Sequence, residues 1–120
     1  MESEQLTVMQ LPRALYLSGP MTGLHNENRA RFYDAADRWR SAGFSVVCPP
    51  EEDARRGPSV RASTMRRDLA LLTRCGGIVL LDGWERSPGA LFELHNAMAM
   101  ELVVLHDRWL NERILNNPGR

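Results

Sequence analysis

The sequence predicts an α/β fold in which helices cover both faces of a parallel sheet. Four short apolar runs, rich in Val, Ile and Leu, do not alternate with polar residues, which is typical of strands buried on both faces. Segments with the apolar spacing of helices separate these runs. This alternation indicates right-handed βαβ units in a three-layer sandwich. The 120 residues suit a single domain, 1–120, with a modest core.

The predicted strands follow from the apolar runs. Residues 1–12 are polar and end in a proline, so we expect them to form a loose leader. The strands expected after it are Ala14–Leu17, Phe44–Cys48, Ile78–Leu81 and Leu102–Leu105.

The first predicted helix spans roughly 28–42. Phe32, Ala36 and Trp39 recur at i, i+4 and i+7, which places them on one apolar face. Gly43 is a natural terminator for this helix.

Two further helices are expected. The second spans roughly 64–75 behind a possible Ser63 cap. The third has Ser87 as its cap and Pro88 as its first residue, a favoured pairing, and runs to about Glu101. The third helix is apolar nearly all round, which is typical of a buried helix.

Two segments outside these elements matter for function. Segment 49–62 is polar and interrupted by proline, so we expect a long loop, and such loops in small domains are usually functional. The tail 106–120 contains Trp109, Leu110, Ile114 and Leu115. It is expected to form a short helix on the body or on a second subunit.

Composition excludes several classes of function. The formal net charge is zero, so no overall field attracts a nucleic-acid polymer or an anionic membrane. All fifteen basic residues are arginine, which excludes Schiff-base chemistry on lysine and a Walker-type phosphate lysine. The basic pairs Arg55-Arg56 and Arg66-Arg67 are interpreted as solvated faces, with a phosphate contact as the alternative.

The cysteines and histidines do not indicate a metal site. Cys48 and Cys75 lie in or beside apolar runs and are interpreted as small buried hydrophobes. The spacing of His25, His95 and His106 does not fit metal ligation. The N-terminus has no signal-peptide pattern and no apolar run is long enough to span a bilayer, so a cytoplasmic protein is expected.

Glu93 is the leading candidate for chemistry. On a helical wheel it lies beside Gly89, Ala90, Ala97 and Met100. The small residues allow the sheet or a ligand to approach a partly desolvated carboxylate. A purely structural glutamate would complement a helix N-terminus or pair with an arginine, but the apolar surroundings favour a functional role.

Three further residues allow two interpretations each. Asp68 lies on the core side of its helix, where it is either functional or an acid favoured by the helix dipole. Tyr16, in a buried strand, either packs in the core or donates its hydroxyl to a carboxylate at a neighbouring strand end. Ser87 caps its helix, and the first turn of that helix is also a potential anion site.

The loops after two of the strands are expected to bind a ligand, since open α/β sheets bind ligands at the carboxyl edge. The first loop, Ser18-Gly19-Pro20-Met21, is not a G-x-G-x-x-G fingerprint, which disfavours a dinucleotide. Trp84 is either a stacking lid or a cover for the sheet edge. The predicted substrate-binding residues are Ser18, Gly19, Pro20, Met21, Asp82, Trp84, Ser87 and Gly89.

These motifs together resemble the nucleoside 2-deoxyribosyltransferase-like superfamily, and most closely its small branch common in bacteria and phages. The matching segments are Tyr16-Leu-Ser-Gly-Pro-Met-Thr-Gly, Met65-Arg-Arg-Asp68-Leu, and Gly83-Trp84 through Ser87-x-Gly89-Ala90-x-x-Glu93. The resemblance covers roughly residues 14–105. It implies a doubly wound, flavodoxin-like fold with a sheet of four to five strands, and a homodimer or larger assembly.

The resemblance also implies an activity, cleavage of the N-glycosidic bond of (deoxy)nucleosides or their 5′-monophosphates, with transfer of the sugar to water or to another base. It implies that Glu93 is the nucleophile, that Asp68 handles the base, and that Tyr16 positions the nucleophile. Ser87 matches a phosphate-contacting serine of the monophosphate hydrolases. Those enzymes carry serine and arginine in the first loop, where this chain has Pro20 and Thr22.

The sequence therefore predicts a small-molecule enzyme acting on a nucleoside or nucleotide without a metal or organic cofactor. The mechanism expected is double displacement with retention. Two alternatives remain open at this stage: a nucleotide-binding or sensing module without turnover, and a purely structural protein.

Overall fold

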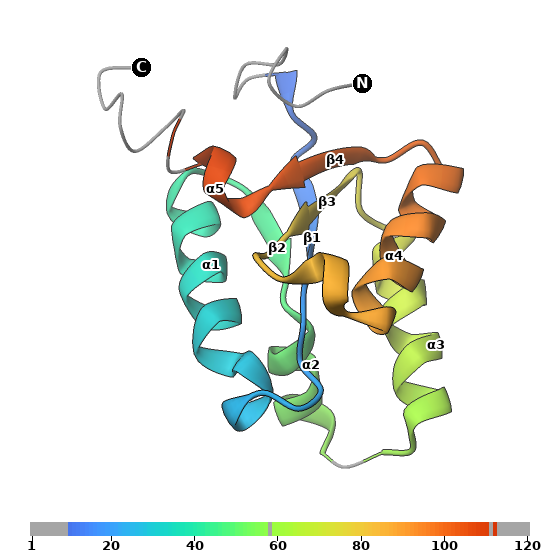
Figure 1. Ribbon diagram of the computed structural model, residues 1–120. Helices are drawn as coiled ribbons and strands as arrows, with labels where there is room; N and C mark the ends of the chain where they lie inside the picture. The colour runs from blue at the N-terminus through green and yellow to red at the C-terminus, as the bar shows by residue number, and fades with distance from the viewer. Residues whose placement is uncertain (1–9, 58, 111, 113–120) are drawn as a thin grey trace.

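The computed structural model describes residues 10–57, 59–110 and 112. The strands are β1 (Ala14–Ser18), β2 (Ser45–Val47), β3 (Gly77–Leu80) and β4 (Val103–His106). They form one parallel sheet in the order β2-β1-β3-β4 (Figure 1). Each strand lies within one residue of its predicted bounds, and the predicted parallel sheet of four to five strands is confirmed, with four strands in the described residues.

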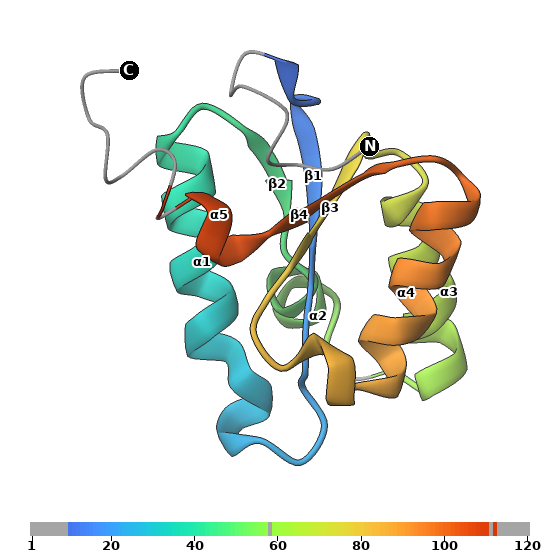
Figure 2. The same ribbon diagram turned by 45° about the horizontal axis from the view of Figure 1, so that its top comes forward.

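Helices cover both faces of this sheet, as predicted. One face is packed against α1 and α5 and the other against α3 and α4, and Figures 1 and 2 show the three layers. The helical segments are η3 (His25–Asn28), α1 (Arg29–Ser41), α2 (Pro49–Arg56), α3 (Arg61–Leu72), η4 (Trp84–Arg86), α4 (Pro88–Ala99) and α5 (Asp107–Leu110). The order is a doubly wound, flavodoxin-like one whose direction reverses between β1 and β3, where such sheets bind ligands.

Strand β1 shows how the pleat divides the core. Leu15 and Leu17 point into the cluster under α1 and α5. Tyr16 points to the opposite face and packs with the cluster under α3 and α4, and Ser18, two residues later, shares its direction. The central strand therefore carries its two hydroxyls on one face of the sheet.

Helix α1 confirms the predicted amphipathic face. Phe32, Ala36 and Trp39 are buried, and Trp39 stacks on Trp109 of α5 with ring centroids 6.4 Å apart. Gly43 follows the helix with φ +104°, a conformation that favours glycine. This aromatic pair joins α1 to the end of the described chain.

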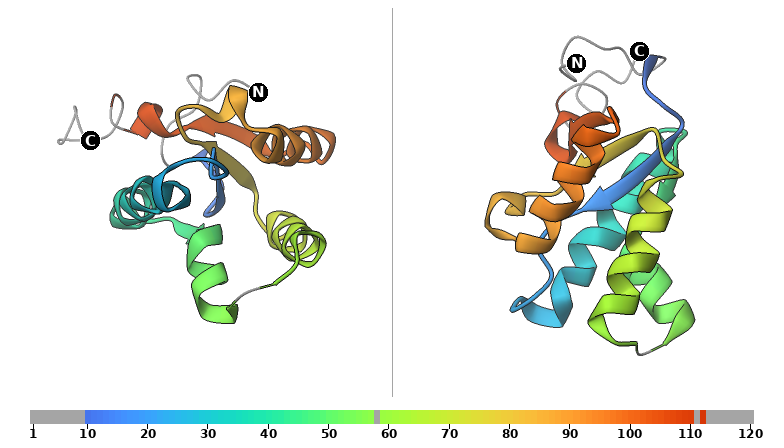
Figure 3. Two further views of the ribbon diagram at one scale, coloured as in Figure 1. Left: turned by 60° about the horizontal axis from the view of Figure 1, so that its bottom comes forward. Right: turned by 90° about the vertical axis from the view of Figure 1, so that its right-hand side faces the viewer.

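The prediction of a loop over 49–62 was wrong for its first half, which forms α2. The two prolines occupy the first turn, where the helix leaves N–H groups unpaired in any case. Acidic residues in the first turn and basic residues in the last complement the helix dipole. Gly57, with φ +81°, ends the helix. Figure 3 (left) shows α2 between α1 and α3 around the carboxyl end of the sheet.

The predicted Ser63 cap was also wrong. Helix α3 begins at Arg61, with Val60 in the cap position, so Ser63 lies within its first turn. By contrast, the Ser87 cap of α4 is confirmed, because the Ala90 N–H donates to Ser87 Oγ over 3.2 Å.

Helix α4 is not buried all round, contrary to prediction. Only Ala90 and Ala97 of this helix are buried. Leu91, Phe92 and Met98 are 42%, 42% and 61% exposed. The helix packs one face on the sheet and on α3, and these three apolar side chains lie on its exposed side.

The segments at the two ends are partly packed. Leu11, placed in the predicted leader, is 7% exposed and belongs to the core. The predicted short helix in the tail is α5, in which Trp109 and Leu110 are buried. Residues 1–9 and the tail residues Ile114 and Leu115 lie outside the described part of the chain.

Both cysteines are free and buried, as predicted. Burial raises the pKa of the Cys48 thiol to about 11, so it remains protonated at neutral pH. Within the described residues, no helix has the length and apolar character needed to cross a bilayer.

Candidate functional site

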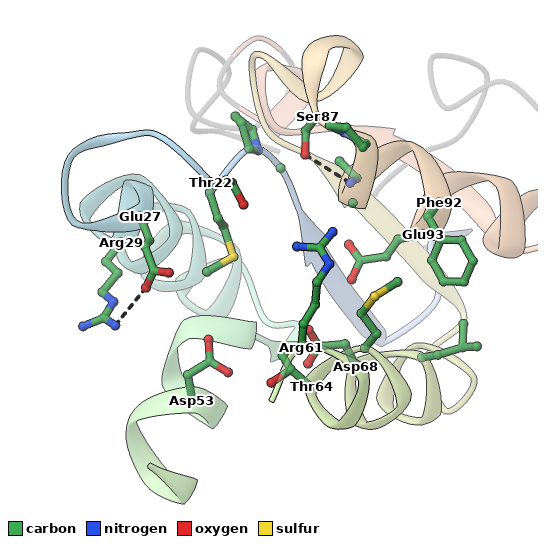
Figure 4. Close-up of a pocket in the computed structure, with 18 of the residues that line it drawn as sticks. Thr22, Glu27, Arg29, Asp53, Arg61, Thr64, Asp68, Ser87, Phe92 and Glu93 are labelled. Carbon is green, nitrogen blue, oxygen red and sulfur yellow. Dashed lines mark hydrogen bonds and ion pairs between the residues drawn. The ribbon is translucent and has the colours of Figure 1, made fainter. Parts of the chain in front are cut away.

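A cavity of about 660 Å³ opens at the carboxyl edge of the sheet, beside the point where the strand order reverses. Its walls come from the loop after β1, the start of α1, α2 with the segment after it, α3 and the start of α4 (Figure 4). Residues from Gly19 to Glu93, far apart in the sequence, therefore meet there. The carboxylates of Asp68 and Glu93, from two different helices, both line it.

Glu93 is held from behind by two hydroxyls of β1. The Tyr16 hydroxyl donates to Glu93 Oε2 over 2.6 Å, and the Ser18 hydroxyl donates to Oε1 over 2.6 Å. Tyr16 and Ser18 are 0% and 1% exposed, so these bonds are shielded from water. Each carboxylate oxygen keeps a further lone pair, and the carboxylate is fixed in one orientation toward the cavity.

The environment of Glu93 changes its acidity. The net effect raises its pKa to about 7, because burial outweighs the hydrogen bonds from Ser18 and Tyr16, which lower it, and the charge of Asp68 also raises it. Burial and the neighbouring Glu93 carboxylate hold the pKa of Tyr16 well above its usual value, so the phenol stays a donor. A carboxyl group with a pKa near neutrality inside a cavity is typical of a functional site.

Asp68 of α3 is the second acid of the cavity. Burial raises its pKa, and the Arg67 guanidinium opposes that effect. Arg67 Nη2 and Nε donate to Asp68 Oδ1 over 2.6 and 3.0 Å, and Nη2 also donates to Asp53 Oδ1 of α2 over 2.6 Å. The predicted solvated face was therefore wrong for Arg67, whose side chain is 8% exposed.

The start of α4 offers donors to the cavity. Ser87 Oγ accepts the capping bond, so its own O–H is available to a ligand. Ser87 and Gly89 both line the cavity, as do Gly19, Pro20 and Met21 of the first loop. Gly19 has a packing role as well, because a Cβ there would lie 2.8 Å from Leu81 Cβ.

Three predicted substrate-binding residues do not line the cavity. Ser18 lies behind Glu93 and bonds to it. Asp82 is 60% exposed and pairs with Arg108 over 3.2 Å. Trp84 packs beside the cluster under α4, with its ring 6.1 Å from that of His106. The turn after β3 thus directs Asp82 and Trp84 away from the two acids.

Sequence reasoning missed the arginines and the α2 residues of the cavity. Figure 4 shows Arg61 reaching into the cavity from α3, and Asp53 on α2. The prolines, acids and bases of segment 49–56 carried the signal for α2, but nothing in the sequence indicated which arginines face inward. The lining residues that were not predicted as a site include Thr22, Glu27, Arg29, Asp53, Arg61, Thr64, Met65, Leu69, Arg86 and Phe92.

The arginines that line the cavity differ in whether they form ion pairs. Arg29 pairs with Glu27 over 3.1 Å. Among the described residues, Arg61 and Arg86 have no ion-pair partner. These two unpaired guanidinium groups make the cavity suited to a ligand with an anionic end.

The described part of the chain contains no cluster of three or more His, Cys, Asp or Glu side chains that could hold a metal ion.

Comparison with protein families matches residues 13–106 to the family described as "Domain of unknown function (DUF4406)". No curated protein matches the chain.

Proposed function

The chain belongs to the DUF4406 family, and on that premise we propose that its cavity cleaves the N-glycosidic bond of a (deoxy)nucleoside or its 5′-monophosphate. The matched region, 13–106, contains the whole sheet and all four acidic residues that line the cavity, Glu27, Asp53, Asp68 and Glu93. The resemblance of three motifs to the nucleoside 2-deoxyribosyltransferase-like superfamily supports the same activity.

One observation carries this proposal. Glu93 is a desolvated carboxylate, fixed by hydroxyls on both oxygens and facing a cavity that a second acid also lines. Such a carboxylate stabilises an oxocarbenium-like sugar and can trap it covalently. A structural glutamate would complement a helix N-terminus or pair with an arginine. Glu93 lies beyond the first turn of α4, and among the described residues no arginine bonds to it.

The first step breaks the bond to the base. An oxygen of ionised Glu93 attacks the anomeric carbon, and the electron pair of the C–N bond leaves with the base. Asp68 donates a proton to the departing nitrogen, so the base leaves neutral. The products of this step are the free base, a glycosyl ester on Glu93 and an ionised Asp68.

The second step releases the sugar. A water molecule, or a second base, attacks the anomeric carbon from the face that the first base left, and Asp68 takes up the proton of the nucleophile. The ester C–O bond breaks and Glu93 is restored. Two inversions give net retention, and no step requires a metal or an organic cofactor.

The 5′ end of the substrate is proposed to lie at the start of α4. The Ser87 O–H and the backbone N–H of Gly89 are available there, and the positive end of the helix dipole favours an anion. Arg61 and Arg86 compensate for the first-loop arginine that the monophosphate hydrolases have. We therefore propose the 5′-monophosphate as the better substrate.

The test is release of free base from a panel of deoxynucleosides, ribonucleosides and their 5′-monophosphates. Arg61→Ala and Arg86→Ala are expected to raise KM for the monophosphate by about 10- to 100-fold, because a hydrogen bond to a charged group contributes roughly 1.5–3 kcal/mol. The KM for the matching nucleoside should change little. Arg66→Ala, an exposed arginine of the same helix outside the cavity, serves as the control.

The outcomes separate the possible functions. Tight nucleotide binding without base release would support a binding or sensing module. Equal loss of affinity for nucleoside and monophosphate in the arginine variants would contradict the 5′-phosphate assignment. The homodimer or larger assembly and the cytoplasmic location stay predictions.

A further inference from the structure

Arg67 is a buried cation between two acids at the edge of the cavity. Its side chain is 8% exposed, and it joins Asp53 of α2 to Asp68 of α3. The neighbouring Arg66 is exposed, so two consecutive arginines have different environments. A buried guanidinium that links two helices can have a purely structural role. The geometry of its bonds to Asp68 points to a further role.

Both bonds from Arg67 go to the same oxygen of Asp68. Nη2 and Nε each donate to Oδ1, over 2.6 and 3.0 Å. Within the described residues, no hydrogen bond reaches Asp68 Oδ2. Because Asp68 lines the cavity, Oδ2 is the oxygen left for a ligand.

We propose that Arg67 is a positioning residue that fixes Oδ1 of Asp68 and thereby presents Oδ2 to the leaving base. This inference rests on the proposed glycosidic-bond cleavage. Asp53 Oδ1 accepts from the same Nη2, so the guanidinium is tied to α2 as well as to Asp68. The arrangement gives the aspartate one anchored oxygen and one oxygen that exchanges a proton.

The arrangement stabilises the step in which the base leaves. When Oδ2 gives its proton to the base, Asp68 becomes negative, and the donors on Oδ1 are already in place for that charge. An interaction that strengthens as charge develops lowers the barrier rather than merely improving binding. Loss of Arg67 should therefore affect departure of the base more than affinity for the substrate.

The charges around Asp68 determine in which direction its pKa shifts when one of them is removed. Arg67 lowers the pKa of Asp68, whereas Asp53 and Glu52 of α2 raise it. The other titratable groups that interact with it are Tyr16 of β1 and Glu93 of α4. Removal of the Arg67 charge should raise the pKa of Asp68, and removal of the Asp53 charge should lower it.

The kinetic test compares Arg67→Met and Arg67→Lys with the matched control Arg66→Met. For a substrate with a neutral base, Arg67→Met is expected to lower kcat about 10- to 100-fold with KM changed less than about threefold. For a 7-methylguanine nucleotide, whose base is already cationic and leaves without a proton, the loss should be less than about threefold. Arg67→Lys should recover part of kcat, and Arg66→Met should match the wild type.

A second measurement needs no turnover. The carbon-13 shift of the Asp68 carboxyl carbon, followed with pH, should give a higher pKa in Arg67→Met and a lower one in Asp53→Asn, with no change in Arg66→Met. Asp53→Asn retains an acceptor for Arg67 and also serves if Arg67→Met does not fold. If the wild type released no base, the proposed function would be overturned, but the pKa of Asp68 could still be measured in each variant.

The positioning role is overturned by either of two results. One is an equal loss of kcat for neutral and cationic bases in Arg67→Met and Arg67→Lys, which indicates a purely structural arginine. The other is an Asp68 pKa that is the same in the wild type, in Arg67→Met and in Asp53→Asn.

Discussion

Replacement of Glu93 by glutamine is expected to reduce base release by about 10⁴-fold or more, the scale of losing a covalent nucleophile. An amide cannot form the glycosyl ester, while its size preserves the packing against Tyr16 and Ser18. The loss should fall on kcat, because the substitution leaves the proposed substrate contacts at the start of α4 in place. Initial rates with the best substrate of the panel give both constants.

Two companion variants sharpen this prediction. Glu93→Asp retains the carboxylate but withdraws it by one methylene, so weak activity should survive. Glu85→Gln makes the same chemical change on an exposed glutamate outside the cavity and should behave as the wild type. A Glu93→Gln enzyme within tenfold of the wild type would contradict the assignment.

The same substitution should stabilise the fold at high pH. Burial gives Glu93 a pKa of about 7 in the folded protein, against 4.5 for an exposed glutamate. Between these values the folded state binds a proton that the unfolded state has released, so the free energy of unfolding decreases as pH rises. The total decrease is about 3 kcal/mol, since one pKa unit corresponds to about 1.4 kcal/mol. Glu93→Gln removes this dependence.

Urea denaturation at pH 4.5 and pH 8 measures this effect. At each pH, the free energy of unfolding of the wild type is subtracted from that of Glu93→Gln. This difference should be about 3 kcal/mol larger at pH 8 than at pH 4.5. Glu85→Gln, at an exposed glutamate outside the cavity, is the control for the chemical change itself. The same difference at both pH values for Glu93→Gln would mean that the folded protein does not hold this carboxyl protonated near neutrality.

Local patterns predicted most of the fold. The strands are apolar on both faces, so their composition marks them within a residue, and the spacing of Phe32, Ala36 and Trp39 identifies α1. Helix α2 was missed because its two prolines were interpreted as breakers, although at the first turn of a helix they are tolerated. The exposed side of α4 was missed because apolar composition alone does not show how many faces the sheet covers.

The candidate site was predictable where the sheet alone determines position. Tyr16 in the middle of β1 and Glu93 on α4 meet because α4 packs on the face of the sheet to which Tyr16 points, and the predicted hydrogen bond from the Tyr16 hydroxyl to a carboxylate is present. The direction of Asp82 depends on the turn after β3, and the inward orientation of Arg67 depends on packing between α2 and α3. Such tertiary contacts leave no periodic signal in a sequence.

The central claim is that Glu93 bonds covalently to the sugar, and intact-mass spectrometry tests it most directly. A 2′-fluoro-arabino analogue of the best substrate should slow release of the sugar, because fluorine destabilises the oxocarbenium-like centre, and the glycosyl ester should accumulate. We predict a mass increase equal to one sugar unit, located by peptide mapping on Glu93 and absent from Glu93→Gln. Stoichiometric release of base with no adduct on the protein, or an adduct on another residue, would contradict the account.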